Sequence, residues 1–303
     1  MLPDGATYLF AATGDSRGQP PAAWRAACIE RSIRLIEIEA GDEDFLRWTE
    51  AGGAPALVNL RDASAVDAFL LAQTTPLFLD ITGSPLGLWA PLIPRVQELG
   101  ITFRAVYVEP NTYSRSQVPS PWKPFDLSER ITGIAPIPSF ASVRRQARDS
   151  VALVPILGFE GARLEFVLQE AELPAEQVYP VLGSPGFRLE YPTFALLGNG
   201  DALLRDQLAL RLTLAKASCP FDLFEALDTI SRQSQLSFMR IAPLGTKPHA
   251  LGAVLYATAA RHRVELLYDN AIPRPGMSEG ASKAWTFFVT EFMQSAHFAG
   301  AGI

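Results

Sequence analysis

The stretch Leu236–Tyr268, LSFMRIAPLGTKPHALGAVLYATAARHRVELLY, carries the pattern that decides the fold. An apolar run over Leu236–Ile241 predicts a buried strand, and the apolar residues of His249–Ala260 predict a helix. A second apolar run, Arg263–Tyr268, predicts another strand. A strand, a helix and a strand in this order are typical of a βαβ unit, whose two strands run parallel in one sheet.

The same layout occurs in the first half of the chain. There a strand over 76–81 and a helix over 86–99 precede a strand over 102–108. Both copies place a cluster of Gly, a hydroxyl residue and Pro between the first strand and the helix, at Thr82–Pro85 and Gly245–Pro248. Further strands are predicted over 7–13, 33–39, 56–60, 151–157 and 177–182, and helices over 22–32, 43–50, 63–73, 162–171, 201–217 and 221–233.

This alternation predicts an α/β fold made of two Rossmann-like halves with mostly parallel sheets, related by an internal pseudo-repeat. A single large α/β sheet is the alternative. We expect the first half over 1–110, a Pro-rich connecting segment over 111–150, and the second half with a C-terminal helix over 151–303. Six prolines fall between residues 109 and 149, so we expect this segment to stay out of the centre of either sheet. A short helix is expected near 141–148.

Composition limits the classes of function. Of the 303 residues, 48 % are hydrophobic and 19 % charged, which excludes a disordered chain. The net charge of −6 argues against general nucleic-acid binding. Because no long apolar stretch and no signal-peptide pattern occur, we expect no membrane span and a cytoplasmic location. The scattered Cys and His residues predict no metal site, and the absence of a G-x-G-x-x-G motif leaves no cofactor to expect.

The loop Pro243–His249 is the first candidate ligand site. In an open α/β sheet, ligands bind outside the carboxyl ends of the strands, where helix N-termini attract anions. Gly245 allows close backbone approach, Thr246 offers a hydroxyl, and Lys247 supplies a positive charge. The alternative is a simple helix cap, with Thr246 as the cap and Pro248 in the first turn.

His249 and the loop that follows the strand over 76–81 complete the candidate residues. His249 is a candidate general acid or base, or else a partly exposed histidine at a helix start. Asp80 at the strand end could accept hydrogen bonds from a ribose, with Thr82, Gly83 and Ser84 beside it. The alternative is that Thr82 or Ser84 only caps the next helix. No catalytic residue is assigned.

A strand followed by Gly245-Thr246-Lys247 at the start of a helix resembles the ligand-sensor domains of prokaryotic defence systems. These are the CRISPR-associated Rossmann-fold (CARF) domains and their SAVED-like relatives in cyclic-oligonucleotide defence. The resemblance implies paired domains with a nucleotide-type ligand across the pair, and a pseudo-equivalent loop at Asp80 and Thr82–Ser84. The chain departs from the family where Leu244-Gly245 replaces the usual Gly-Gly and Pro248 follows the lysine. No fused effector is visible, so an effector would be a separate chain.

Three hypotheses of function follow. The first is a non-enzymatic nucleotide-binding or regulatory protein, such as a subunit of a defence system. Its internal pseudo-dimer forms the ligand site, and it works with a separate partner protein. The second is a Rossmann-like hydrolase or transferase acting on a nucleotide through Asp80, Lys247 and His249. The third is a scaffold subunit that docks a partner through an apolar C-terminal helix over 282–293.

Overall fold

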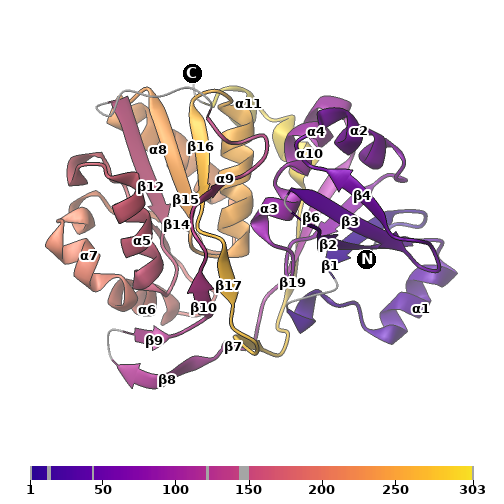
Figure 1. Cartoon of the computed structure of the whole chain (residues 1–303), viewed down its shortest axis with the longest axis horizontal. Coiled ribbons are helices and arrows are strands. Elements are labelled where there is room, and N and C mark those ends of the chain that lie inside the picture. The colour runs from indigo at the N-terminus through magenta and orange to yellow at the C-terminus, as the bar shows by residue number, and fades with distance from the viewer. Residues whose placement is uncertain (1, 12–14, 43, 121–122, 143–149, 302–303) are drawn as a thin grey trace. The chain divides into compact units, whose positions relative to one another are not determined.

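A computed structural model of the chain (Figure 1) describes residues 2–11, 15–42, 44–120, 123–142 and 150–301. The chain forms two compact units. Unit 1 comprises Met1–Thr112 and Ser278–Ser295, and unit 2 comprises Tyr113–Met277 and Ala296–Ile303. Each unit therefore combines segments that are distant in sequence, whereas the sequence predicts two continuous halves.

The described part of unit 1 is built on a seven-stranded mixed sheet. Across the sheet, the strands are β19 (Ala284–Phe287), β6 (Phe103–Val108), β5 (Leu77–Asp80), β1 (Thr7–Ala11), β2 (Arg34–Ala40), β3 (Phe45–Glu50) and β4 (Ala56–Asn59). β6, β5, β1 and β2 run parallel, while β19 and β3 are antiparallel to their neighbours. Every residue of β1 and β5 is buried, as expected for central strands covered on both faces.

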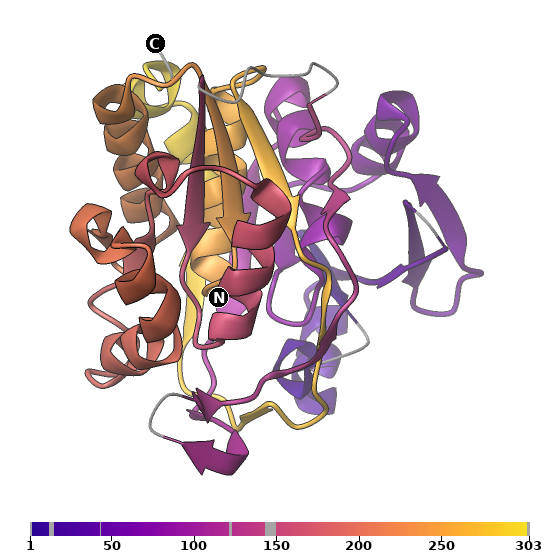
Figure 2. The same cartoon turned by 60° about the vertical axis from the view of Figure 1, so that its left-hand side comes forward.

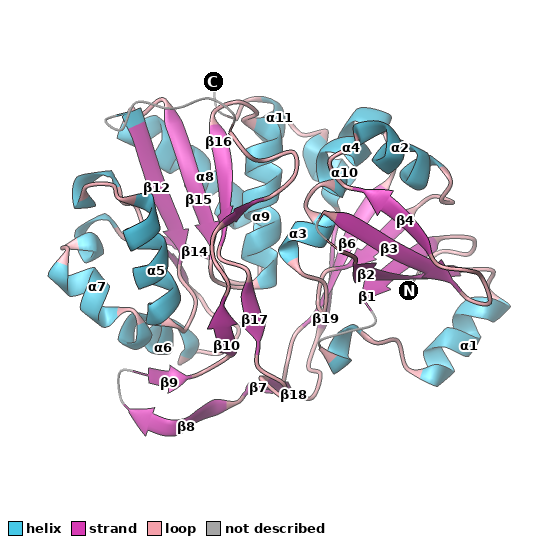
Figure 3. Ribbon diagram, in the orientation of Figure 1, coloured by secondary structure: helices cyan, strands magenta, loops and turns pink. Residues whose placement is uncertain are grey.

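Helices cover both faces of the unit 1 sheet. They are η1 (Ser16–Gly18), α1 (Ala22–Glu30), α2 (Ala63–Leu71), α3 (Leu86–Trp89), α4 (Leu92–Leu99) and α10 (Val289–Met293). Figure 3 shows α2 and α4 side by side on one face and α1 on the other. The Asp62 carboxylate caps α2 by accepting the N–H groups of Ser64 and Ala65. Gly100, with a φ of 66°, ends α4 in the left-handed conformation that glycine adopts without strain.

The described part of unit 2 is built on a six-stranded sheet. Across the sheet, the strands are β11 (Ala135–Pro136), β16 (Val264–Tyr268), β15 (Phe238–Pro243), β12 (Val151–Ile156), β13 (Val181–Gly183) and β14 (Thr213–Ala215). All are parallel except the edge strand β11. In Figure 2, α5 (Gly161–Ala171) lies in front of this sheet, with α8 (Pro220–Ser234) and α9 (Lys247–Ala259) on the opposite face.

Shorter elements complete the chain. They are β7 (Thr112–Tyr113), β8 (Arg115–Ser120), β9 (Lys123–Phe125), β10 (Ser128–Ile131), η3 (Ala175–Gln177), α6 (Tyr191–Gly198), α7 (Gly200–Arg205), η4 (Leu208–Arg211), β17 (Ala271–Pro273), β18 (Ser278–Glu279) and α11 (Ala296–Ala299). β8 pairs with β9 and β10 with β17.

Helix α9 is the central helix of unit 2 and is buried along nearly its whole length. It packs against β15 and β16 of the sheet, against α8 beside it and against α11, so it has no polar face to present to water. Its Gly252 allows this packing, because a Cβ there would lie 2.4 Å from the carbonyl oxygen of Pro220. The contact places the start of α8 against the middle of α9.

The α/β class is confirmed, but the helix predicted over 43–50 is wrong, and those predicted over 201–217 and 282–293 are helical only in part. Residues 45–50 form β3, because Leu46 is buried and Trp48 pairs with Ile38 of β2 in an antiparallel hairpin. The 201–217 stretch divides into α7, η4 and β14, and the 282–293 stretch into β19 and α10. In each case pairing with a distant strand overrides the local helical pattern.

The described part of the Pro-rich segment stays out of the centre of both main sheets, as predicted. Between residues 109 and 149 the described part contributes only β11 to either main sheet, at its edge. Most of the helix expected near 141–148 lies outside the described residues, as do the final residues of the strand expected over 7–13. Among the described helices, none combines the length and the hydropathy that crossing a membrane requires.

Candidate functional site

The strand order of unit 2 defines where a ligand would bind. From the central strand β12, the chain proceeds to β13 and β14 on one side and then to β15 and β16 on the other. The loops that follow β12 and β15 therefore leave the carboxyl ends of these strands in opposite directions. Ligands of open α/β sheets bind at such a point. Both loops belong to the part of the chain that the structure describes.

These two loops approach each other through their backbones. A Cβ on Gly158 would lie 2.2 Å from the carbonyl oxygen of Leu244, and one on Gly245 would lie 2.8 Å from that of Leu157. Real side chains do not tolerate such distances, so both positions require glycine. Because residue 245 is glycine, no side chain of its own covers its backbone at the carboxyl ends of the strands.

Thr246 caps helix α9, as the alternative interpretation predicts. Its Oγ1 accepts the N–H of His249 at 3.3 Å and donates to the carbonyl oxygen of Ala217 at 2.7 Å. Pro248 in the first turn has no N–H to satisfy. In the described chain, the N–H groups of Gly245 and Thr246 find no hydrogen-bond partner, and Gly245, Thr246 and Lys247 are all half-buried. The cap therefore leaves backbone donors beside Lys247.

The structure brings a second lysine to this edge. The sequence predicts that Lys216 lies in the helix over 201–217, away from the candidate loops, whereas the residue lies exposed in the turn between β14 and α8. Its carbonyl oxygen is 3.0 Å from His249 Nε2, and its N–H donates to the Asp222 carboxylate. We call the two segments 216–219 and 244–249 the lysine loops, since they carry Lys216 and Lys247.

The buried His249 links the two lysine loops through its hydrogen bonds. It is 1 % exposed, and burial lowers the pKa of its imidazole to about 4. The ring is therefore neutral at pH 7. Because Nε2 faces the carbonyl oxygen of Lys216, Nε2 carries the proton, and the buried Nδ1 has no partner in the described chain. The side chain is thus not the partly exposed histidine of the alternative interpretation, and it acts as a positioning residue.

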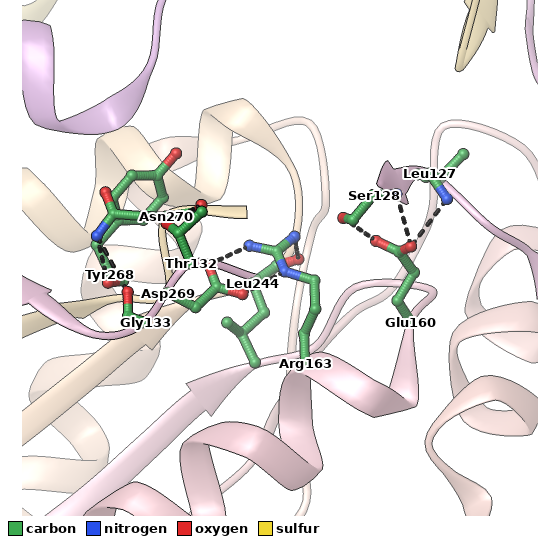
Figure 4. Close-up of polar contacts among 10 residues, drawn as sticks. All are labelled: Leu127, Ser128, Thr132, Gly133, Glu160, Arg163, Leu244, Tyr268, Asp269 and Asn270. Atoms are coloured by element: carbon green, nitrogen blue, oxygen red, sulfur yellow. Dashed lines mark hydrogen bonds and ion pairs between the residues drawn. The ribbon is translucent and has the colours of Figure 1, made fainter. Parts of the chain in front are cut away.

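An ion pair that the sequence does not predict fixes the loop after β15 (Figure 4). Arg163 of α5 donates two hydrogen bonds to Asp269, at 2.6 and 2.7 Å, and a third to the carbonyl oxygen of Leu244 at 3.2 Å. Burial lowers the pKa of Arg163, but the hydrogen bonds and charge of Asp269 outweigh burial and raise it. The Arg163 guanidinium is therefore paired within the protein, and it holds the loop after β15 in place.

The loop after β12 has its own support (Figure 4). The Glu160 carboxylate accepts the N–H groups of Leu127 and Ser128, each at 2.8 Å, and the Ser128 hydroxyl at 2.7 Å. Nothing in the sequence around Glu160 or Arg163 distinguishes these contacts, because their partners are distant along the chain.

The second predicted loop, in unit 1, follows β5 at the equivalent sheet position. Asp80 is 2 % exposed and accepts the Tyr8 hydroxyl and the Thr82 N–H, both at 2.8 Å. Thr82 Oγ1 accepts the N–H of Val108 at 2.9 Å, and the Ser84 hydroxyl donates to the carbonyl oxygen of Asp80 at 3.2 Å. Three predicted side chains of this loop are thus bound to the protein itself.

The loop after β5 in unit 1 differs from the lysine loops in its charges. Burial raises the pKa of the Asp80 carboxyl, although the hydrogen bonds from Thr82 and Tyr8 and the charge of Arg17 act in the opposite direction. Arg17 forms a buried ion pair with Asp15, so its charge is already neutralised. Gly83 is the half-buried residue of this loop, and its N–H has no partner in the chain as described.

No model of a known protein family matches the chain, and no curated protein sequence matches it. Among the described residues, no three His, Cys, Asp or Glu side chains are grouped so that they could hold a metal ion.

Proposed function

We propose that the protein binds an anionic, nucleotide-type ligand at the lysine loops of unit 2 and acts as a non-enzymatic sensor or regulatory subunit. One observation carries the proposal. The turns after β14 and β15 bring Lys216 and Lys247 to the starts of two neighbouring helices, at the sheet edge where α/β proteins bind ligands. Two ammonium groups, unpaired backbone donors and two helix dipoles favour a phosphate group there.

The geometry favours binding over catalysis. An enzyme using His249 as general acid or base needs an imidazole that reaches the substrate and titrates near neutral pH. Burial removes both properties from His249. Asp80 is likewise buried, and it is hydrogen-bonded to Tyr8 of β1 and to Thr82 of its own loop. Neither His249 nor Asp80 therefore fits a proton-transfer role, and the lysines have a binding role.

The pseudo-repeat is part of this proposal. In unit 1 the order β6-β5-β1-β2 and in unit 2 the order β16-β15-β12-β13 are both parallel, with β1 and β12 the first strands of their units. An ancestral duplication explains this common order. It also supports the resemblance to CARF and SAVED-like sensors, in which two such domains share a ligand, and a role in defence with a separate effector chain.

Calorimetric titration with ATP and with inorganic tripolyphosphate tests the proposal. A charge-assisted hydrogen bond contributes about 1.5–3 kcal/mol, so Lys247→Ala should weaken binding of both by about 10- to 150-fold. Its melting temperature should stay close to that of the wild type. Lys283→Ala, an exposed lysine of unit 1, is the matched control and should bind normally. Equal affinities for Lys247→Ala and the control would refute the proposal.

A further inference from the structure

An aromatic cluster lies at the same sheet edge of unit 2 as the lysine loops. It consists of Tyr113, Phe125, Phe159, Tyr191 and Phe194. Phe159 directly follows the Gly158 that touches Leu244, and its ring centroid is 4.4 Å from that of Phe125 and 5.3 Å from that of Tyr191. The rings come from elements distant in sequence, so the fold assembles them.

The cluster is not an ordinary core. Phe125 is buried, but Tyr113, Phe159, Tyr191 and Phe194 are only half-buried. Two exposed arginines lie over its rings, with the guanidinium of Arg115 5.5 Å from the centroid of Phe194 and that of Arg188 6.0 Å from the centroid of Tyr191. Aromatic faces next to guanidinium groups are the surface on which proteins stack planar rings of anionic ligands.

One loop connects the aromatic cluster with the lysine loops. At the start of this loop, the N–H of Ser184 donates to the carbonyl oxygen of Ala215 at 2.8 Å. Next, the carbonyl oxygen of Pro185 accepts the N–H of Ala217 at 3.1 Å. The loop then reaches Arg188 and Tyr191. The lysines and the aromatic rings therefore belong to one continuous edge of unit 2.

We infer that the aromatic cluster is the subsite for the base of the ligand, with Tyr191 as a stacking surface and Arg188 at its rim. The inference rests on the proposed function and deepens it. It states that recognition has two parts, a phosphate part at Lys216 and Lys247 and a planar-ring part at Tyr191. A nucleotide should therefore bind more tightly than a phosphate chain of equal charge.

The test compares ATP with tripolyphosphate on Tyr191→Leu and Tyr191→Phe. Stacking of a base on an aromatic side chain accounts for about a 5- to 150-fold difference in affinity. We expect the wild type to prefer ATP by this factor and Tyr191→Leu to lose the preference while binding tripolyphosphate normally. Tyr191→Phe keeps the ring and should keep the preference. Phe288→Leu, a half-exposed ring of unit 1, is the control for loss of an aromatic side chain elsewhere.

The outcomes separate this inference from the proposed function. Equal binding of ATP and tripolyphosphate by the wild type would overturn the base subsite and leave the phosphate site standing. An ATP preference that survives in Tyr191→Leu would also overturn the subsite. Failure of the wild type to bind either probe would overturn both. A Tyr191→Leu variant that does not fold is replaced by Arg188→Gln, which removes the cation over the ring and should lower affinity for ATP relative to the wild type. An unchanged ATP affinity in Arg188→Gln would count against the inference.

Discussion

The stability of unit 2 should fall in mild acid because of one buried residue, His249. Its imidazole is neutral in the fold, with a pKa lowered from 6.5 to about 4 by burial. The folded state therefore resists a proton that the unfolded chain accepts. Stability from this source is fully present above the unfolded pKa of 6.5 and is lost as pH falls through the window down to about 4.

The size of the loss follows from the two pKa values. Each pKa unit of difference corresponds to about 1.4 kcal/mol. Integrating the proton linkage from about pH 8 to about pH 5 gives a loss of roughly 2 kcal/mol of unfolding free energy from His249 alone. His249→Gln keeps a donor able to reach the carbonyl oxygen of Lys216 and removes the titration. The variant should be less stable than the wild type at pH 8 and should lose about 2 kcal/mol less on acidification.

Urea unfolding followed by far-UV circular dichroism at several pH values measures this difference. His262→Asn is the matched control, because His262 is exposed and asparagine tolerates its positive φ of 73°. The control should show the wild-type pH dependence. The imidazole resonance of His249, identified by its absence in His249→Gln, gives the pKa directly. A titration midpoint near 6.5 for His249 in the folded protein, or a His249→Gln variant that loses stability as steeply as the wild type, would refute the role of His249.

Three further predictions concern the loops. Gly158→Ala should lower the unfolding free energy by about 1–3 kcal/mol, since its Cβ would collide with the carbonyl oxygen of Leu244; unchanged urea unfolding would contradict this. Asp269→Ala should lower the unfolding free energy by about 3–5 kcal/mol, because it leaves the Arg163 charge buried without a partner. Replacing Arg163 by Met in the same chain should recover part of the loss. A double variant no more stable than Asp269→Ala would show that the charge is not the cause. The raised pKa of Asp80 means that the fold favours its protonated form, so stability from this group is present below the ordinary aspartate pKa and declines as pH rises through the raised value. Asp80→Asn should lack that decline in urea unfolding between acidic and neutral pH, and an identical pH profile for variant and wild type would exclude the assignment.

The sequence alone determined the α/β class and the central strands. Runs such as residues 8–11 and Val151–Ile156 contain no charged residue and are almost entirely apolar, as expected for strands covered on both faces. The sequence also predicts the helix start at Gly245-Thr246-Lys247, because a capping threonine and a proline in the first turn are local signals. Such local signals depend only on residues that are close in sequence, so they can be recognised before the fold is known.

Tertiary structure decided what the local pattern could not. The Phe45–Glu50 segment is a strand because β2 and β4 pair with it, and Lys216 belongs to the candidate site because β14 ends beside β13. Arg163 finds Asp269 more than a hundred residues away. The sequence predicts that His249 is a general acid or base, or else a partly exposed histidine at a helix start, yet the packing of α9 buries it and keeps it neutral. Contacts between residues distant in sequence set burial and pairing, and burial and pairing set the chemistry of each side chain.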